Sequence, residues 1–242
     1  MKNDFAFHLA LVMAEPDGHK DPGYLADVIV EHSVTRVHFV PSMLDVFLAE
    51  PKAALCSSLE IVNCSGEALP VHVARKVSEI LPNTLVDNLY GPTETTVCAT
   101  IAPCTAEMDT VPIGRPIANT RIHILDAHQQ ILPPGIPGEL CIAGAGLARG
   151  YLNRPELTAE KFITAEILGR TERLYRTGDL ARWLPDGNLE YLGRIDHQIK
   201  LRGFRIELGE IEAVLSSHEA VSAAAAVLHE RAESKSDRKS VV

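Results

Sequence analysis

The sequence has few aromatic residues and no long apolar run. Aromatic residues make up 5% of the 242 residues, and no run approaches the roughly 18–20 apolar residues that a membrane-spanning helix requires. The five cysteines are odd in number and form no Cys-x-x-Cys pair, which predicts reduced thiols in a cytosolic protein. The ten histidines include no His-Glu-x-x-His, so a structural metal site is not expected.

Cationic residues are also in deficit. The chain has 23 Lys and Arg against 32 Asp and Glu, which gives a formal net charge of −9. A surface that binds nucleic acid needs clustered cations to neutralise phosphates, so the composition argues against nucleic acid as a partner. With 46% hydrophobic residues, the chain has enough apolar material for one large domain or two smaller ones.

The first ninety residues alternate between strand-like and helix-like stretches. Strands separated by helices predict a parallel sheet covered by helices, and such sheets bind ligands beyond the carboxyl ends of their strands. The first strand-like run lies in FAFHLALVMA (5–14), which has no small-residue cleavage site, so a buried strand is expected rather than a signal peptide. The strand-like runs are 8–14, 35–40, 58–64 and 84–90, and the helix-like stretches are 21–32, 41–50 and 69–81.

The composition and hydrophobic pattern of the sequence change twice after this region. From residue 111 onward Gly and Pro are frequent, which predicts a small, mostly β subdomain with strands at 121–126, 139–144, 173–183 and 189–193 and a turn at 185–188. Beyond Arg194 we expect a β-like run at 197–206, a helix at 207–218, a strand or short helix at 221–229 and a disordered tail at 231–240. The predicted divisions are 1–110, 111–195 and 196–242.

Single motifs carry little information about function. GAGLARG (144–150) has the spacing G-x-G-x-x-x-G, and Pro155 prevents a long helix at its third glycine, so it predicts a turn-rich β connection. No G-x-x-x-x-G-K-[ST] phosphate loop occurs. Asp179 in YRTGDL (175–180) suits a turn, but it also suits a carboxylate that accepts hydrogen bonds from a ribose diol. The charged run 193–212 is typical of a solvated surface, although its two glycines suit a flexible backbone.

The segment NLYGPTETT (88–96) follows a predicted strand and adds a second set of polar groups. Tyr90 alone would be a strand-end aromatic residue, and Glu94 alone a solvated loop acid. Together with Thr93 and Asp179, they supply an aromatic face for a base, a hydroxyl and a carboxylate for phosphate and Mg²⁺, and an aspartate for ribose.

In these motifs the sequence resembles the amino-acid adenylation domains of nonribosomal peptide synthetases, within the superfamily of adenylate-forming enzymes. The resemblance covers roughly residues 10–230 and implies an α/β fold. It would comprise part of the large lobe, with a parallel sheet, helices and a small β-barrel-like subdomain, and the start of an α+β C-terminal lobe. Four segments match consecutive family motifs in order: NLYGPTETT, GELCIAGAGLARGYLNRPELTAEKF (138–162), YRTGDLARW (175–183) and GRIDHQIKLRGFRIELGEIE (193–212).

The resemblance implies roles for individual residues at a nucleotide site. Tyr90 would stack on adenine, Asn88 would contact the adenine amino group, and Asp179 would bind the ribose. Thr93 would contact the α-phosphate, and Glu94 would bind Mg²⁺. The implied nucleotide-binding residues are Asn88, Tyr90, Gly91, Thr93, Asp179 and Arg194.

The resemblance also implies a two-step reaction. The family joins an amino acid to ATP to form an aminoacyl-AMP and pyrophosphate, and a carrier-protein phosphopantetheine thiol then takes the aminoacyl group. Neighbouring synthetase modules would be further partners. Asp196 would be the hinge of the C-terminal lobe, and Gly203 would line the route of the thiol. A pocket for a small or polar amino-acid side chain would be lined by His38, Asn63, Ser65, Leu89, Val97 and Cys98.

The sequence departs from the family in ways that affect catalysis. It has no upstream phosphate loop, no aspartate for the substrate amino group and no Asn-Gly-Lys motif with the catalytic lysine, so no catalytic residue is assigned. We therefore expect a fragment that is inactive alone and that associates through exposed strand edges. Two alternatives remain: a nucleotide-binding remnant that needs a partner chain, and an acyl-CoA synthetase fragment, which Asn63 and Ser65 disfavour.

Overall fold

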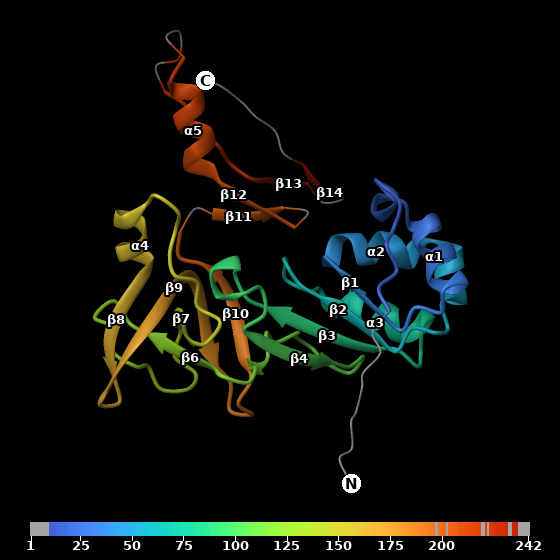
Figure 1. The fold of residues 1–242 in the computed structure, drawn as a ribbon, viewed down its shortest axis with the longest axis horizontal. Helices are drawn as coiled ribbons and strands as arrows, with labels where there is room; N and C mark the ends of the chain where they lie inside the picture. Colours follow the sequence, from blue (N-terminus) through green and yellow to red (C-terminus); the bar gives the residue numbers. More distant parts are fainter. Residues whose placement is uncertain are drawn as a thin grey trace.

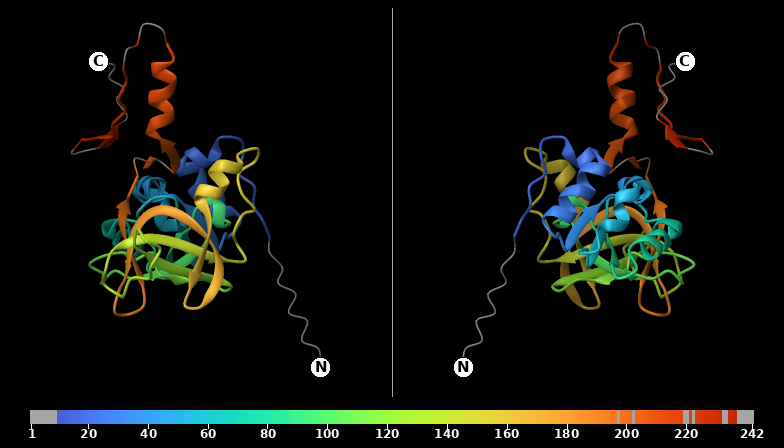
Figure 2. Two further views of the ribbon diagram at one scale, coloured as in Figure 1. Left: turned by 90° about the vertical axis from the view of Figure 1, so that its left-hand side faces the viewer. Right: turned by 90° about the vertical axis from the view of Figure 1, so that its right-hand side faces the viewer.

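The computed structural model describes residues 10–196, 198–201, 203–218, 221, 223–231 and 234–236. Two five-stranded sheets lie side by side, and a C-terminal arm rises above them (Figure 1). Both views in Figure 2 show the helix of this arm projecting away from the sheets. Among the described residues, no helix has the length and apolar character required to cross a membrane.

The first sheet and its helices form the N-terminal unit. Its elements are η1 (Gly18–Lys20), α1 (Pro22–Glu31), β1 (Arg36–Phe39), α2 (Pro41–Ala49), η2 (Pro51–Leu55), β2 (Ile61–Cys64), α3 (Val71–Ile80), β3 (Leu85–Tyr90), η3 (Thr93–Thr95), β4 (Thr100–Cys104) and β5 (Arg115–Pro116). The strand order is β1-β2-β3-β4-β5, and β1, β2 and β3 are parallel, as the alternation of strands and helices predicts. The antiparallel addition of β4 and β5 was not predicted.

The helices of this unit begin where the sequence chemistry favours a start. The Asp21 carboxylate accepts hydrogen bonds from the backbone N–H groups of Gly23 and Tyr24, which caps α1. Pro41 is the first residue of α2, a position where the missing N–H costs nothing. The helices bury apolar side chains such as Leu44 against the sheet, and this buried cluster is the core of the unit.

The second unit is a twisted antiparallel sheet. Its elements are β6 (Thr120–Leu125), β7 (Gly138–Gly144), α4 (Pro155–Lys161), β8 (Phe162–Ile167), β9 (Arg170–Trp183) and β10 (Leu189–Arg194). The order is β10-β9-β7-β6, with β8 paired to β9, so the sheet is open where a barrel-like subdomain was predicted. The predicted turn at 185–188 joins β9 to β10, and the GAGLARG segment is a loop after β7, as predicted.

Gly114 connects the two units. Its carbonyl accepts a hydrogen bond from Leu189 at 2.8 Å, and Leu189 in turn accepts one from Ile113 at 2.8 Å. Gly114 has a φ of 83°, and a Cβ atom there would lie 1.9 Å from the carbonyl oxygen of Ile101. Only glycine fits this crossing, which holds the segment before β5 between β4 and the start of β10.

The C-terminal arm consists of β11 (Gln198–Leu201), β12 (Phe204–Glu207), α5 (Leu208–Ser216), β13 (His229–Arg231) and β14 (Ser234–Ser236). The β-like run predicted at 197–206 is a hairpin that turns at Gly203, which has a φ of 77°. The hairpin lies over the junction of the two units, whereas α5 has no buried residue.

Three predictions about elements were wrong. Residues 10–14, predicted to lie in a buried strand, form no strand and are mostly exposed, while residues 8 and 9 lie outside the described residues. The described residues of 221–229, which do not include residue 222, form neither the strand nor the helix considered, except that His229 begins β13. Ser234–Ser236 pair as a strand where a disordered tail was predicted, and residues 232, 233 and 237–240 of that tail are not described.

Candidate functional site

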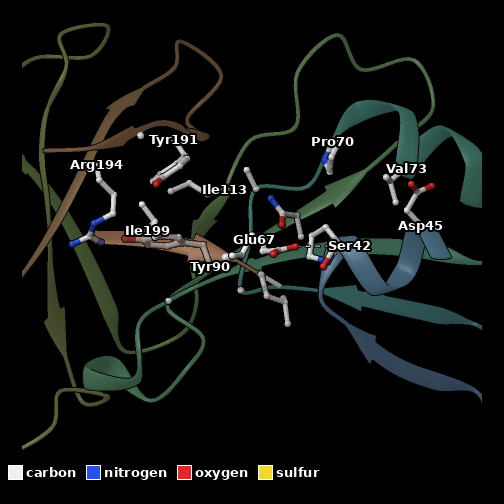
Figure 3. Close-up of a pocket in the computed structure, with 18 of the residues that line it drawn as sticks. Ser42, Asp45, Glu67, Pro70, Val73, Tyr90, Ile113, Tyr191, Arg194 and Ile199 are labelled. Atoms are coloured by element: carbon white, nitrogen blue, oxygen red, sulfur yellow. Dashed lines mark hydrogen bonds between the residues drawn. The ribbon is translucent and has the colours of Figure 1, made fainter. Parts of the chain in front are cut away.

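A cavity of about 810 Å³ lies where the two units and the hairpin meet. Its walls come from α2, from the loop after β2, from the carboxyl end of β3 and from β10, and β11 closes it. This is the end of the parallel strands where a ligand was predicted. In Figure 3, Tyr90, Tyr191, Arg194 and Ile199 gather at one end of the cavity, and Pro70, Val73 and Asp45 lie at the other.

Tyr90 joins the cavity wall to a buried ion pair. The Tyr90 hydroxyl donates a 2.5 Å hydrogen bond to Asp179 Oδ2, across 89 residues of sequence. Arg194 Nη1 donates to Asp179 Oδ1 at 2.8 Å, and only 2% of Asp179 is exposed. The structure thus brings together three residues predicted from separate motifs: an aromatic ring, a carboxylate and a guanidinium.

Burial and charge fix the protonation of this group. Burial of Tyr90, followed by the nearby charge of Asp179, raises the pKa of its hydroxyl well above the ordinary value of 10.0, so the hydroxyl stays a donor. Arg194 keeps its charge although burial opposes it, because hydrogen bonding to Asp196 and the charge of Asp179 raise its pKa. The cavity therefore has a fixed hydrogen-bond polarity at this end.

Asn88 lines the cavity next to Leu89, and a hydrogen bond fixes the orientation of its side-chain amide. The Nδ2 group donates to the carbonyl oxygen of Pro112 at 2.8 Å, and that oxygen can only accept. The remaining Oδ1 atom is therefore a hydrogen-bond acceptor. An acceptor at this position suits a ligand amino group.

The turn after β3 is tightly packed and strained. A Cβ atom on Gly91 would lie 2.6 Å from the carbonyl oxygen of Val97, so glycine is required by close approach. Thr96 and Val97 have φ values of 63° and 69°, a conformation that β-branched residues rarely adopt. Such strain is typical of functional turns. Gly91 follows directly after β3, and Thr93, which is exposed, begins η3 on this turn.

Glu94 lies at the centre of a second polar group. Tyr151 donates its hydroxyl hydrogen to Glu94 Oε1 at 2.6 Å, and Arg205 Nη1 lies 3.0 Å from Oε1 and 2.8 Å from Oε2. Arg205 belongs to β12, so this ion pair connects the hairpin to the turn after β3. Burial alone would raise the pKa of Glu94, but the hydrogen bond from Tyr151 and the charge of Arg205 outweigh it and lower the pKa below 4.5.

The chemistry of Glu94 fits a divalent cation held jointly with a ligand. Among the described residues, no group of three or more His, Cys, Asp or Glu side chains could hold a metal alone. Magnesium commonly binds one or two carboxylates plus substrate phosphates, and a single carboxylate is what the turn offers. The Arg205 guanidinium on that carboxylate shows that the position accommodates a positive charge.

The predicted hinge and thiol-route residues lie at the junction of the hairpin. Asp196 accepts hydrogen bonds from Arg194 at 2.5 and 2.6 Å, which connects the hinge to the buried ion pair. The backbone N–H of Gly203 donates to Glu67 Oε1 at 3.1 Å, and Ser42 N donates to Oε2 of the same carboxylate at 3.2 Å. Glu67 therefore holds the hairpin turn against the start of α2.

The predicted amino-acid pocket is only partly assembled. His38 and Ser65 are hydrogen-bonded at 2.7 Å, and His38 is in register with Asn63 on the neighbouring strand. Burial lowers the pKa of His38, which favours the neutral ring. Of the six predicted residues, Leu89 lines the 810 Å³ cavity, whereas the other five do not: His38, Asn63, Ser65, Val97 and Cys98.

Several residues in these groups were not predicted. The sequence analysis gave no role to Glu67, Tyr151 or Tyr191. Arg205 was placed in a solvated charged run, but it is paired with Glu94. The pairing spans 111 residues, so no local spacing could have indicated it.

Comparison with known proteins gives consistent matches. The family described as AMP-binding enzyme matches residues 7–152. Tyrocidine synthase 3 of Brevibacillus parabrevis is 50% identical over 216 residues, and phosphinothricin tripeptide synthetase PhsB of Streptomyces viridochromogenes is 53% identical over 212 residues. A solved structure of holo-PA1221, a nonribosomal peptide synthetase protein with adenylation and carrier domains, has a TM-score of 0.81 and 33% identity over 87% of this chain.

The chain matches one part of much longer proteins. The two synthetases align with 88% of this chain, but the chain covers 3% of the first and 18% of the second. It covers 37% of the holo-PA1221 chain. FmoA3 bound to α-methyl-L-serine-AMP has a TM-score of 0.70 and 34% identity, and the match covers 76% of this chain and 21% of that one.

Proposed function

The chain belongs to the family of AMP-binding enzymes, and from that premise we propose that it binds the AMP part of a nucleotide as one portion of an amino-acid-adenylating site. The observation that carries the proposal is that Tyr90 and Arg194, which line one end of the cavity, both bind the buried Asp179 carboxylate, which is not itself a lining residue. This group combines an aromatic ring with a buried carboxylate whose lone pairs are only partly used. A nucleoside presents the complementary features, a flat base and a diol with two donors.

Each residue in this group has a distinct proposed task. The Tyr90 ring supports the adenine, and the free Asn88 Oδ1 accepts a hydrogen bond from the adenine amino group. Asp179 accepts hydrogen bonds from the ribose hydroxyls, while Arg194 balances its charge. The hydrogen bond from Tyr90 to Asp179 keeps the base support and the sugar acceptor in one fixed relation.

The phosphate end of the ligand is proposed to lie along the turn after β3. Thr93 offers an exposed hydroxyl there, and Glu94 offers a carboxylate. A magnesium ion, when bound, would neutralise charge on the phosphates. Arg205 occupies the Glu94 carboxylate in the present arrangement, so the hairpin must move before Glu94 can accept a cation.

The proposed reaction joins an amino acid to AMP. The amino-acid carboxylate oxygen attacks the α-phosphorus of ATP, the bond from that phosphorus to the bridging oxygen breaks, and pyrophosphate leaves. A carrier-protein pantetheine thiol then attacks the carbonyl carbon, and AMP leaves with the bonding electrons. The relatives named as peptide synthetases, and the structure named as a serine-type adenylate complex, support this substrate class.

We further propose that this chain alone does not complete the reaction. Its 242 residues contain no Asn-Gly-Lys motif and no glycine-rich phosphate loop. Amino-acid-dependent exchange of pyrophosphate into ATP should therefore stay at background with every amino acid tested. Exchange above background would overturn this part of the proposal and leave nucleotide binding intact.

Isothermal titration calorimetry of the folded chain tests the nucleotide site directly. AMP should bind, and 2′,3′-dideoxy-AMP should bind about tenfold more weakly or worse, because it lacks the hydroxyls that donate to the charged Asp179. Inosine monophosphate should also bind more weakly, because it presents an acceptor to Asn88 Oδ1 where AMP presents a donor. Failure of the folded chain to bind AMP, or equal affinity for all three, would overturn the proposal.

A further inference from the structure

We infer that Tyr151 is a positioning residue that holds the Glu94 carboxylate in place for a divalent cation. The inference rests on the proposed function, because it concerns the phosphate end of the same site. Tyr151 lies in GYLNRP, a segment whose role the sequence left open. Its hydroxyl is 57 residues from Glu94 in sequence and 2.6 Å from Glu94 Oε1 in space.

Both oxygens of Glu94 contact Arg205, but only one of them accepts from Tyr151. Oε1 accepts hydrogen bonds from the Tyr151 hydroxyl at 2.6 Å and from Arg205 Nη1 at 3.0 Å, whereas Oε2 accepts from Arg205 Nη1 at 2.8 Å. When Arg205 leaves, Oε1 remains bound to Tyr151 and Oε2 gains a free lone pair. The carboxylate is then held at one oxygen and open at the other, which is the arrangement a metal needs from a single carboxylate.

Tyr151 is held by the second unit and not by the hairpin. Its backbone N–H donates to Thr158 Oγ1 at 2.9 Å, and its ring packs edge-on against Phe162 with centroids 5.7 Å apart. Phe162 in turn packs on Tyr175 at 5.0 Å. Gly150 lets the chain approach α4, because a Cβ atom there would lie 2.4 Å from Thr158 Cγ2. These contacts fix the hydroxyl regardless of where the hairpin lies.

The backbone of the same loop also holds Glu94. Ala148 N donates to the carbonyl oxygen of Glu94 at 2.8 Å, and Thr96 Oγ1 donates to the carbonyl oxygen of Gly146 at 2.7 Å. These hydrogen bonds hold the loop that carries Tyr151 against the turn that carries Glu94. Among the hydrogen bonds of the described residues, the Tyr151 hydroxyl is the only side-chain group of this loop that donates to the Glu94 carboxylate. Arg205 reaches the carboxylate from β12, a separate element.

The test compares Mn²⁺ binding to the full chain and to a Tyr151→Phe variant in the presence of AMP. Water-proton relaxation reports protein-bound Mn²⁺ without any turnover. The variant keeps the ring that packs on Phe162 and loses only the hydroxyl. We expect its dissociation constant for Mn²⁺ to rise about 10-fold to 100-fold, the usual cost of losing a partner of a metal ligand, while AMP affinity without metal stays unchanged.

Two further variants make the result specific. Tyr24→Phe removes a tyrosine hydroxyl whose partner is the remote Glu15 backbone, and it should leave Mn²⁺ binding as in the wild type. Thr158→Val keeps the Tyr151 hydroxyl but removes the side-chain oxygen that accepts a hydrogen bond from the Tyr151 backbone N–H. This variant should weaken Mn²⁺ binding by a smaller factor. Thr158→Val also keeps the test open should Tyr151→Phe fail to fold.

The outcomes separate this inference from the proposed function. Equal Mn²⁺ affinity in wild type and Tyr151→Phe would overturn the positioning role, even if the variant melts earlier. A wild-type chain that binds AMP but no Mn²⁺ would overturn the inference and leave the nucleotide site standing. A folded wild-type chain that binds no AMP would overturn the proposed function itself.

Discussion

Asp179 shows how strongly one buried residue can be constrained by its neighbours. It is 2% exposed and receives hydrogen bonds from two donors, Tyr90 and Arg194, at 2.5 and 2.8 Å. A carboxylate has enough lone pairs to satisfy both and still accept from a ligand. An asparagine amide of the same shape cannot accept from both donors, because its NH₂ group would face one of them.

This conflict predicts the effect of Asp179→Asn. The variant should lose about 1–3 kcal/mol of stability, because a buried donor is left without an acceptor, and AMP affinity should fall at least tenfold. Urea unfolding and calorimetric titration measure the two effects. Asp109→Asn removes an exposed carboxylate and should change neither quantity. Unchanged AMP affinity in a folded Asp179→Asn variant would contradict the proposed ribose contact.

Some site residues could be found from the sequence, and others could not. Tyr90 ends β3, as its motif predicted, whereas Asp179, expected after a strand and a glycine turn, lies inside β9. Both motifs could be read locally, but the hydrogen bond that joins them across 89 residues could not. The Arg205–Glu94 pair was not, because it depends on how the hairpin folds back over 111 residues. The motif that contains Tyr151 was found, but the direction of its hydroxyl follows from packing on Phe162.

At the scale of elements, the β11–β12 hairpin is attached to the core by few polar contacts. Glu94 binds Arg205 of β12, and Glu67 accepts from Gly203 at the turn. Burial raises the pKa of Glu94, but the Tyr151 hydrogen bond, a backbone hydrogen bond and the charge of Arg205 together lower it; only the Arg205 part depends on the hairpin, so the docked state binds fewer protons than a state in which Arg205 has left. Docking is therefore fully favoured where Glu94 is ionised and weakens as the pH falls through the lowered pKa of this carboxyl.

Acidification should accordingly release the hairpin before the core unfolds. Hydrogen exchange of the backbone amides at 204–207, corrected for intrinsic rates, should show a loss of protection between pH about 5 and about 3. In Arg205→Gln the pair is missing, so protection should be low at neutral pH and nearly independent of pH. Full protection of the wild-type hairpin at pH about 3 would contradict the role of this ion pair.

Elements were predicted best where pattern and contact agree. The helices α1–α3 follow Pro and Asp signals at their starts and bury an apolar face, so their positions were confirmed within a residue or two. The apolar run at 8–14 failed because strand formation needs a neighbouring strand, and residues 10–14 pair with none. The addition of β4 and β5 was missed because nothing local distinguishes them from loop segments.

At the scale of the whole molecule, the first sheet has one open face. Helices cover the face that carries Val62 and Val86, whereas Leu85 on the other face is 66% exposed. Leu85 is in register with Ile61, and Ile61 with Arg36, so an apolar pair lies beside the edge strand β1. Parallel strands are normally buried on both faces, so this surface is unusual for a monomer.

The open face predicts concentration-dependent association of the chain. Sedimentation velocity should show species larger than the 26.3 kDa monomer as the protein concentration rises. Leu85→Lys places a charge on the exposed face and should shift the distribution toward the monomer, because association through this face would bury the charged lysine. Val46→Lys changes an exposed apolar residue on α2 and should have no such effect. If the wild-type chain stays monomeric at every concentration, the exposed face that carries Leu85 is stable in contact with water. There would then be no physical reason to expect that another protein surface covers this face.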